Sequence, residues 1–323
     1  MFFDTLGKIR AIRNIRVPMS LTELLATFAN NLLPVMLIGA AGFLLGRALH
    51  IDSRTLGRVI FYLFSPVLVF DLLLHNDLPL GEMARTIGFC LAVFATMSTL
   101  TLIVGKIARL DRLTMTAVLL TAAFANTGNY GLPLVAFAFG EDALAHATLY
   151  FVTTSILFNT VGVLIASLGH LDFKQAALGM LKVPTVYAVI LAASLNQFHV
   201  TMPAPLERAI GLAADGAIPL MLILLGVELA RVEWSHSLRA LGLGAGLRLI
   251  VGPLVGFLLA IPFGLTGAAH QGNLVETATP AAVTNAVLAT EYKLDTSLVT
   301  AIIFIGTILS PLTLTPLLVY LGR

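Results

Sequence analysis

The sequence predicts an all-α integral membrane protein of ten transmembrane helices arranged as two inverted five-helix repeats. Three observations carry this prediction. Of the 323 residues, 58% are hydrophobic and only 11% are charged, whereas soluble domains carry about 25% charged residues. Apolar runs of roughly 20 residues recur along the chain, and each is long enough to cross a hydrocarbon core of about 30 Å. The third observation is an internal repeat of prolines.

The expected spans are joined by loops too short to fold as soluble domains, so we expect the function to lie within the bundle. The spans are predicted at 26–48, 54–75, 83–105, 113–139, 143–168, 182–197, 204–231, 237–262, 267–290 and 296–320.

Three pairs of prolines recur at a nearly constant distance of 150, 153 and 147 residues, namely Pro34 with Pro184, Pro66 with Pro219, and Pro133 with Pro280. This spacing divides the chain into two halves of five spans. Because five is odd, the second half must enter the membrane from the opposite side, which gives an inverted repeat of the kind found in secondary transporters.

Spans 4 and 9 are both interrupted by helix-breaking and polar residues. The interruptions hold Asn126, Thr127, Gly128, Asn129, Gly131 and Pro133 in span 4, and Thr277, Thr279, Pro280, Thr284 and Asn285 in span 9. Open backbone at membrane depth is tolerated only inside protein or beside water. Where half-helices begin, free N–H groups and the positive dipole end favour an anion. Two proline kinks repaired by polar residues are the alternative; the repeat-related positions favour a substrate site.

Lysine and arginine are concentrated in the loops after odd-numbered spans, which are therefore predicted to be cytoplasmic. They include Arg54, Arg58, Lys106, Arg231 and Lys293. Both termini are accordingly expected on the periplasmic side of a bacterial inner membrane. The basic tail of residues 1–18 disagrees with this rule and is interpreted as an accessory extension, either an amphipathic surface helix or a disordered tail. Ser20 and Glu23 have capping-box spacing for the first span.

Several segments together resemble the auxin efflux carrier family, which includes plant PIN carriers and bacterial permeases often described as malonate transporters. "NTGNYGLPL" at 126–134 is similar to the family's first crossover, and "TPAAVTNAVLATEY" at 279–292 to its second. "SPVLVFDLLLHND", "AADGAIPLMLILLGVELA" and "GLRLIVGP" resemble spans 2, 7 and 8. The resemblance runs from about residue 25 to the end.

The resemblance implies an elevator carrier with the crossed broken helices of NhaA and the bile acid symporters. After an N-terminal tail of residues 1–25, residues 26–75 and 182–231 would form a scaffold that also mediates homodimers. Residues 83–168 and 237–320 would form the transport domain. In plant carriers the asparagine matching Asn126 lies at the substrate carboxylate. Val183 and Thr185 flank Pro184 where plant members have an asparagine, and Asn285 replaces a second proline. These differences argue against auxin itself.

The candidate site residues fall into three groups. Substrate binding is expected of Asn126, Thr127, Asn129, Thr279, Thr284 and Asn285; the crossover itself depends on Gly131, Pro133 and Pro280; candidates for charge or coupling are Asp71, Asp215, Arg248 and Glu276. Ionisable residues inside spans are costly and therefore functional candidates. Arg248 either binds the substrate or, as we favour, neutralises a carboxylate such as Glu276. Asp71 and Asp215 either exchange protons or cap a helix beside water.

The leading hypothesis is a secondary transporter, an efflux carrier or permease, for a small carboxylate. The alternative is sodium-coupled uptake of organic anions of the bile-acid-symporter type, which needs oxygen ligands clustered at the crossing. An intramembrane enzyme is not expected, since no histidine pair has metal-ligand spacing. A net charge of +2 excludes a nucleic-acid partner. Cofactors and metals are not expected.

Lipid surrounds the bundle, and glycine pairs at four-residue spacing (Gly42 with Gly46, Gly242 with Gly246, Gly252 with Gly256) predict close helix packing.

Overall fold

The computed structural model describes residues 19–49, 51–76, 78–167, 180–198, 201–232, 234–235 and 237–323, and within these ranges it contains helices and no β-strand. Seven helical runs are long and apolar enough to span a membrane: Leu21–Leu49, Ser53–His75, Leu80–Ile107, Thr127–Ala166, Ala204–Leu229, Leu238–Phe263 and Thr296–Leu321. An all-helical integral membrane protein is thereby confirmed. The interpretation of residues 1–18 as an extension lies outside the described residues.

The helical runs are built from shorter elements, several of which are joined by a five-residue π-helical turn. In chain order they are α2 (Leu21–Thr27), η1 (Phe28–Leu32), α3 (Leu33–Leu49), α4 (Ser53–Val59), η2 (Ile60–Phe64), α5 (Ser65–His75), α6 (Leu80–Ile107), α7 (Arg112–Ala123), η3 (Thr127–Gly131), α8 (Leu132–Leu157), η4 (Phe158–Gly162), α9 (Val163–Ala166), η5 (Met180–Lys182), α11 (Pro184–Gln197), α12 (Ala204–Leu229), α13 (Leu238–Gly246), η6 (Leu247–Val251), α14 (Gly252–Phe263), α15 (Gly267–Ala278), α16 (Thr284–Glu291) and α17 (Thr296–Leu321).

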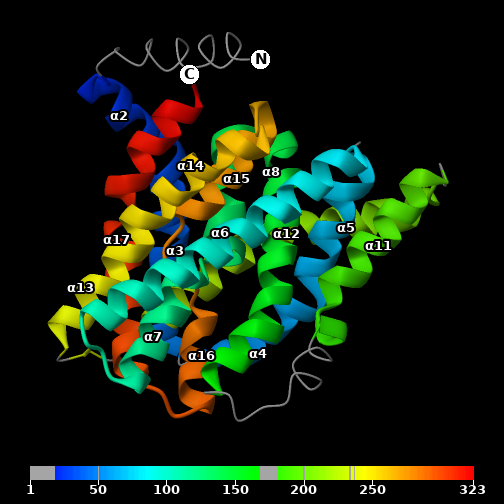
Figure 1. The fold of residues 1–323 in the computed structure, drawn as a ribbon. Helices are drawn as coiled ribbons and strands as arrows, with labels where there is room; N and C mark the ends of the chain where they lie inside the picture. Colours follow the sequence, from blue (N-terminus) through cyan, green and yellow to red (C-terminus); the bar gives the residue numbers. More distant parts are fainter. Residues whose placement is uncertain are drawn as a thin grey trace, which may run out of the picture.

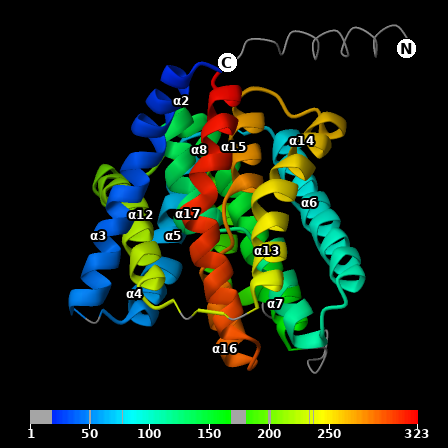
Figure 2. The same cartoon turned by 90° about the vertical axis from the view of Figure 1, so that its left-hand side faces the viewer.

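Both described ends of the chain lie at the same end of the bundle, whereas α4, α7 and α16 reach toward the opposite end (Figures 1 and 2). Ser20 caps α2 by accepting a hydrogen bond from the Glu23 N–H at 3.1 Å. The Glu23 carboxylate pairs with the Arg323 guanidinium, with Oε2 and Nη2 2.6 Å apart. The carboxylate therefore ties the start of α2 to the end of α17 instead of completing a capping box.

Helices α3, α5, α11 and α12 pack on one another, with α12 against both α3 and α5 and α11 against α5. The α3–α12 contact depends on glycine. A Cβ atom at Gly226 would collide with the Gly39 carbonyl oxygen, and one at Gly42 with the Ile223 carbonyl oxygen. The two backbones approach this closely because neither residue carries a side chain, as small residues allow between membrane helices. The prediction of close packing at Gly42 is confirmed.

The remaining helices form the other part of the bundle, in which α15 packs against α8 and α14, and α13 against α7 and α17. Gly256 lies against Thr277 of α15, so close packing is confirmed there too. Gly242 and Gly246 have open space where a Cβ would be, so the same prediction is wrong for that pair. Within α8, Gly140 adopts φ 76° and ψ −164°, a left-handed conformation suited to glycine that bends the chain between residues 139 and 141.

Candidate functional site

The two predicted interruptions lie side by side and complete each other's backbone hydrogen bonds. Helix α7 ends at Ala123 and η3 begins at Thr127, while α15 ends at Ala278 and α16 begins at Thr284. The open segments run antiparallel and form an isolated bridge between Ala125 and Ala281. The Asn126 N–H donates to the Pro280 carbonyl at 2.7 Å. The Ala282 N–H donates to the Phe124 carbonyl at 3.0 Å. The breaks therefore cross inside protein, where unwound backbone is tolerated.

Arg248 joins the C-terminal ends of the two half-helices. Its side chain is 2% exposed. Nε donates to the Thr279 carbonyl at 2.9 Å and Nη1 donates to the Ala122 carbonyl at 3.1 Å. Nη2 donates to the Thr277 carbonyl. A cation at helix C-termini compensates the negative end of the dipole and satisfies carbonyl groups that lack intrahelical partners.

The contacts of Arg248 differ from the carboxylate pairing that the sequence suggests. All three donor nitrogens reach backbone carbonyls, and among the described residues Arg248 forms no ion pair with Glu276. Sequence reasoning could not find these partners because carbonyl groups carry no sequence signal.

The N-terminal ends of the other two half-helices lack a side-chain cap. No side chain accepts from the first N–H groups of η3 or of α16. By contrast, α4, α7 and α17 are capped by Asp52, Asp111 and Asp295. The first N–H groups of a helix attract anions, although in α16 the Asn285 and Ala286 N–H groups donate to the Ala282 and Val283 carbonyls, each at 3.1 Å. The Asn126 side chain is buried beside this end, and its Nδ2 has no hydrogen-bond partner in the described part of the chain.

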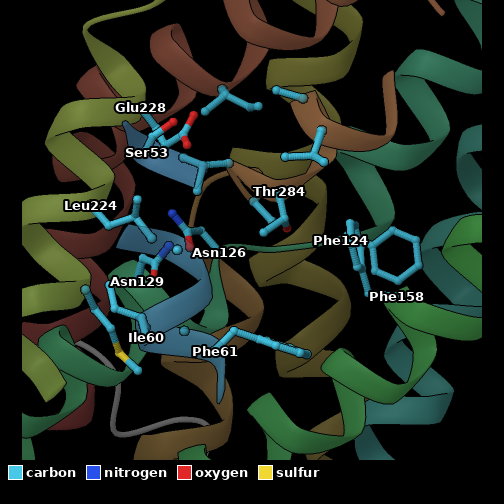
Figure 3. Close-up of a pocket in the computed structure, with 18 of the residues that line it drawn as sticks. Ser53, Ile60, Phe61, Phe124, Asn126, Asn129, Phe158, Leu224, Glu228 and Thr284 are labelled. Atoms are coloured by element: carbon cyan, nitrogen blue, oxygen red, sulfur yellow. The ribbon is translucent and has the colours of Figure 1, made fainter. Parts of the chain in front are cut away.

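A cavity of about 1310 Å³ reaches from the crossing to one end of the bundle. Asn126, Thr127, Asn129 and Thr284 lie on its wall at the crossing. Figure 3 shows Asn126 and Asn129 close together, with Thr284 nearby and the rings of Phe124 and Phe158 to one side. Both half-helix starts therefore open on one cavity.

The mouth of the cavity carries charges of both signs. Arg54, Arg58, Arg231, Asp52, Glu228 and Glu291 line this end. The Thr55 hydroxyl donates to Asp52 at 2.6 Å, and this bond holds the pKa of the Asp52 carboxyl below its ordinary value. The basic residues here belong to the loops that the sequence predicts to be cytoplasmic.

The remaining predicted site residues of span 9 lie behind the cavity wall. Thr279 and Asn285 are fully buried and do not line the cavity. The Thr279 hydroxyl donates to the Glu276 carbonyl at 3.0 Å, and Asn285 Nδ2 donates to the Phe124 carbonyl at 3.2 Å. Pro280 accepts the hydrogen bond that joins the two breaks. Pro133 is buried at the start of α8, directly after the π-helical turn η3.

Glu276 is the most deeply enclosed acid of the described residues. It is 0% exposed, and neither carboxyl oxygen has a hydrogen-bond partner in the described ranges. Its carboxyl group occupies the space where a Cβ of Gly131 would stand. Gly131 is therefore required because the Glu276 carboxyl touches the backbone of η3.

The two aspartates predicted in spans 2 and 7 lie away from the crossing and do not line the cavity. Asp71 is one-quarter exposed and lies 3.4 Å from His75 Nδ1 through its Oδ1. Asp215 is exposed on α12. Neither residue is brought together with the candidate binding residues.

Sequence reasoning missed the aromatic lining of the cavity, formed by Phe61, Phe124, Phe151 and Phe158. Phenylalanines in an apolar span give no local signal that separates a cavity wall from a lipid-facing surface. Arg54 and Arg58 at the mouth were visible in the sequence, although only as indicators of orientation.

The chain is similar in sequence to known membrane transport proteins. The model of a family described as "Membrane transport protein" matches residues 27–176 and 170–318. An "Uncharacterized transporter" of Methanothermobacter thermautotrophicus is 28% identical over 88% of this chain and 94% of its own length. A "Putative malonate transporter" of Rhizobium meliloti is 28% identical over 93% of this chain and 97% of its own. "Auxin efflux carrier component 3a" of Oryza sativa subsp. japonica is 28% identical over 42% of this chain and 23% of its own.

Proposed function

The chain belongs to the auxin efflux carrier family of membrane transport proteins, and we propose that it is a secondary carrier for a small carboxylate. Transport by this chain would proceed by alternating access, with the anion held at the crossing of the two broken helices. The relatives' names extend from malonate to auxin, so they support a carboxylate without choosing among carboxylates.

One observation carries this proposal: two half-helix starts without a side-chain cap open on the same cavity, beside an amide with no partner among the described residues. Asn126 Nδ2 is a donor, as are the backbone N–H groups that follow it. A carboxylate supplies acceptor oxygens and negative charge, which both features favour. Uncharged donors also bind an anion weakly enough to release it, as a carrier requires.

The ten-span elevator remains part of the proposal. It is supported by the order of elements, since each half has three helical runs and a broken helix followed by a further run. In the second half this last run is α17, and in the first half it is the part of α8 after the kink at Gly140, continued by η4 and α9. The scaffold would comprise residues 26–75 and 182–231, and the moving domain residues 83–168 and 237–320. The cavity mouth lies among basic loops, so this conformation would be open to the cytoplasm, with both termini on the periplasmic side of an inner membrane. A homodimer through the scaffold completes the proposal.

Binding of radiolabelled oxalate, malonate and indole-3-acetate to the purified protein tests the carboxylate site. We expect saturable binding of at least one of them. Asn126→Ala should weaken it about tenfold or more, because the variant loses a hydrogen bond to a charged group worth roughly 1.5–3 kcal/mol.

Asn76→Ala is the matched control. Asn76 also presents a part-buried amide, which donates to the Leu72 carbonyl at 2.9 Å, but it lies outside the cavity. This variant should bind as the unmodified protein does. If no carboxylate binds, or if both variants bind equally well, the proposed site is wrong.

A further inference from the structure

Glu276 is the one buried acid at the crossing among the described residues, and the carboxylate site proposed above makes no use of it. It lies two residues before the end of α15. Its carboxyl group contacts Gly131, the last residue of η3, and the first residues of η3 line the cavity. The acid therefore contacts the same π-helical turn that is proposed to hold the substrate, without lining the cavity itself.

The described surroundings of Glu276 provide no partner for a negative charge. An ionised carboxylate buried without a hydrogen bond or counter-ion costs several kcal/mol. Arg248 is the nearest cation, yet its three donor nitrogens are engaged by the carbonyls of Ala122, Thr277 and Thr279. The positive charge of the guanidinium is therefore already matched by the negative ends of two half-helices.

The other ionisable groups close enough to interact electrostatically with Glu276 are Cys90 on α6 and Tyr150 on α8. Neither a thiol nor a phenol can carry a positive charge. Cys90 Sγ lies 3.4 Å from the Thr154 hydroxyl. On η3 itself, the Tyr130 hydroxyl is directed away to Ser310 Oγ at 2.8 Å. None of these groups supplies a positive charge to the acid.

Resting on the proposed carboxylate site, we propose that Glu276 is the proton-coupling group of the carrier, holding a proton when the substrate anion is bound. Loss of that proton would place a negative charge against η3. The same turn would then face two anions, the substrate beside its first residues and the Glu276 carboxylate at Gly131. Because like charges repel strongly in a medium of low dielectric, deprotonation and anion binding oppose each other.

Thermodynamic linkage makes this opposition reciprocal: the anion binds more tightly to the protonated carrier, and bound anion favours protonation of Glu276. One proton would therefore accompany each anion through the transport cycle. Glutamine at this position has the shape and neutrality of the protonated acid. Glu276→Gln should consequently hold the carrier in the state that binds anion at every pH.

The test measures the affinity of the purified full-length chain for oxalate and indole-3-acetate from about pH 6 to about pH 8, where their carboxyl groups are largely ionised. The wild type should lose affinity as the pH rises, by at most about tenfold per pH unit for one linked proton. Glu276→Gln should vary less than about twofold over the same range. Glu207→Gln, an exposed acid beside His75 and outside the cavity, should retain the wild-type pH dependence.

Calorimetry on the unmodified protein gives a second readout that needs no variant to fold. In two buffers of different ionisation enthalpy, anion binding should take up as much as one proton. Carboxylate binding without proton uptake, or an unchanged pH dependence in Glu276→Gln, would overturn the coupling role and leave the binding site standing. Absence of carboxylate binding in every protein would instead overturn the proposed function, and this inference with it.

Discussion

The crossing of the broken helices has two poles that differ in how their backbone groups are satisfied. At the C-terminal pole, the carbonyls that end α7 and α15 are joined by a single buried arginine. At the N-terminal pole, η3 and α16 begin without a side-chain cap, and the amide nitrogen of Asn126 has no partner among the described residues. At the first pole the carbonyls are satisfied by a side chain of the protein, whereas at the second the Asn126 amide nitrogen is left to the cavity.

This difference separates the residues of the two interruptions that stabilise the structure from those that remain available to a ligand. Both poles arise from the same kind of sequence, a proline or glycine amid asparagine and threonine. Buried polar groups in folded proteins are nearly always paired. An unpaired donor on the cavity wall, as Asn126 Nδ2 is among the described residues, is therefore informative, whereas the paired carbonyls around Arg248 indicate a structural clamp.

The largest effect is expected at the C-terminal pole. Arg248→Met keeps much of the side-chain volume but leaves three buried carbonyls without their donor. We expect a loss of about 3 kcal/mol or more in the free energy of unfolding, at roughly 1–3 kcal/mol for each unsatisfied group. Thermal unfolding in detergent measures this loss. An unchanged unfolding temperature together with lost carboxylate binding would show that Arg248 serves the substrate and not the clamp.

Gly131→Ala tests the contact between η3 and Glu276. The added methyl group would collide with the carboxyl group, and overpacking of this kind costs about 1–3 kcal/mol. Glu276→Ala removes the obstacle, so the double variant should be less destabilised than the sum of the two single variants. Additive unfolding energies in this cycle would show that the two residues do not touch.

A smaller contrast is expected between the asparagines of the two breaks. Asn285 donates to the Phe124 carbonyl, so Asn285→Ala should lower the free energy of unfolding by about 1 kcal/mol. Asn126→Ala removes an amide nitrogen that has no partner in the described part of the chain and should change stability by less than that. If both variants lost the same free energy of unfolding in a denaturation assay, Asn285 could not be called structural and Asn126 available to a ligand.

The smallest effect concerns the outer end of α7, which is capped in the way that the inner half-helix starts are not. Asp111 accepts from the Thr114 N–H at 3.1 Å. Its hydrogen bond with Thr114 holds the pKa of the Asp111 carboxyl below its ordinary value.

Because the folded-state pKa of Asp111 is lowered, this stabilisation is present above the unfolded-state pKa of about 3.9 and is lost as the pH falls through the folded-state value. Asp111→Ala should cost about 0.5 kcal/mol at neutral pH, at the lower end for an exposed cap. The loss of stability caused by Asp111→Ala should be smaller in acid than at neutral pH. Unfolding of the variant and of the unmodified protein, measured under both conditions, checks this. A cost that grew in acid would contradict the assigned cap.

Much of this architecture could be predicted from residues alone. The sequence predicts the two breaks, at 126–133 and 277–285, because proline, glycine and amides within an apolar run disfavour a continuous membrane helix. The partners of Arg248 could not be predicted, since they are backbone carbonyls brought together only by the crossing. The burial of Thr279 and Asn285 away from the cavity likewise could not be predicted. It depends on how the helices on either side of the break are rotated, and the residues of a short break do not determine that rotation.

The central claim is that the anion binds at the uncapped pole. The most direct measurement is a crystal structure with a brominated carboxylate that competes with the radiolabelled ligand, in which anomalous scattering locates the bromine. We predict the carboxylate within hydrogen-bond distance of Asn126 Nδ2 and of the first N–H groups of η3. A carboxylate held by Arg54 or Arg58 at the cavity mouth, or by Arg248 after it releases its carbonyls, would contradict the account.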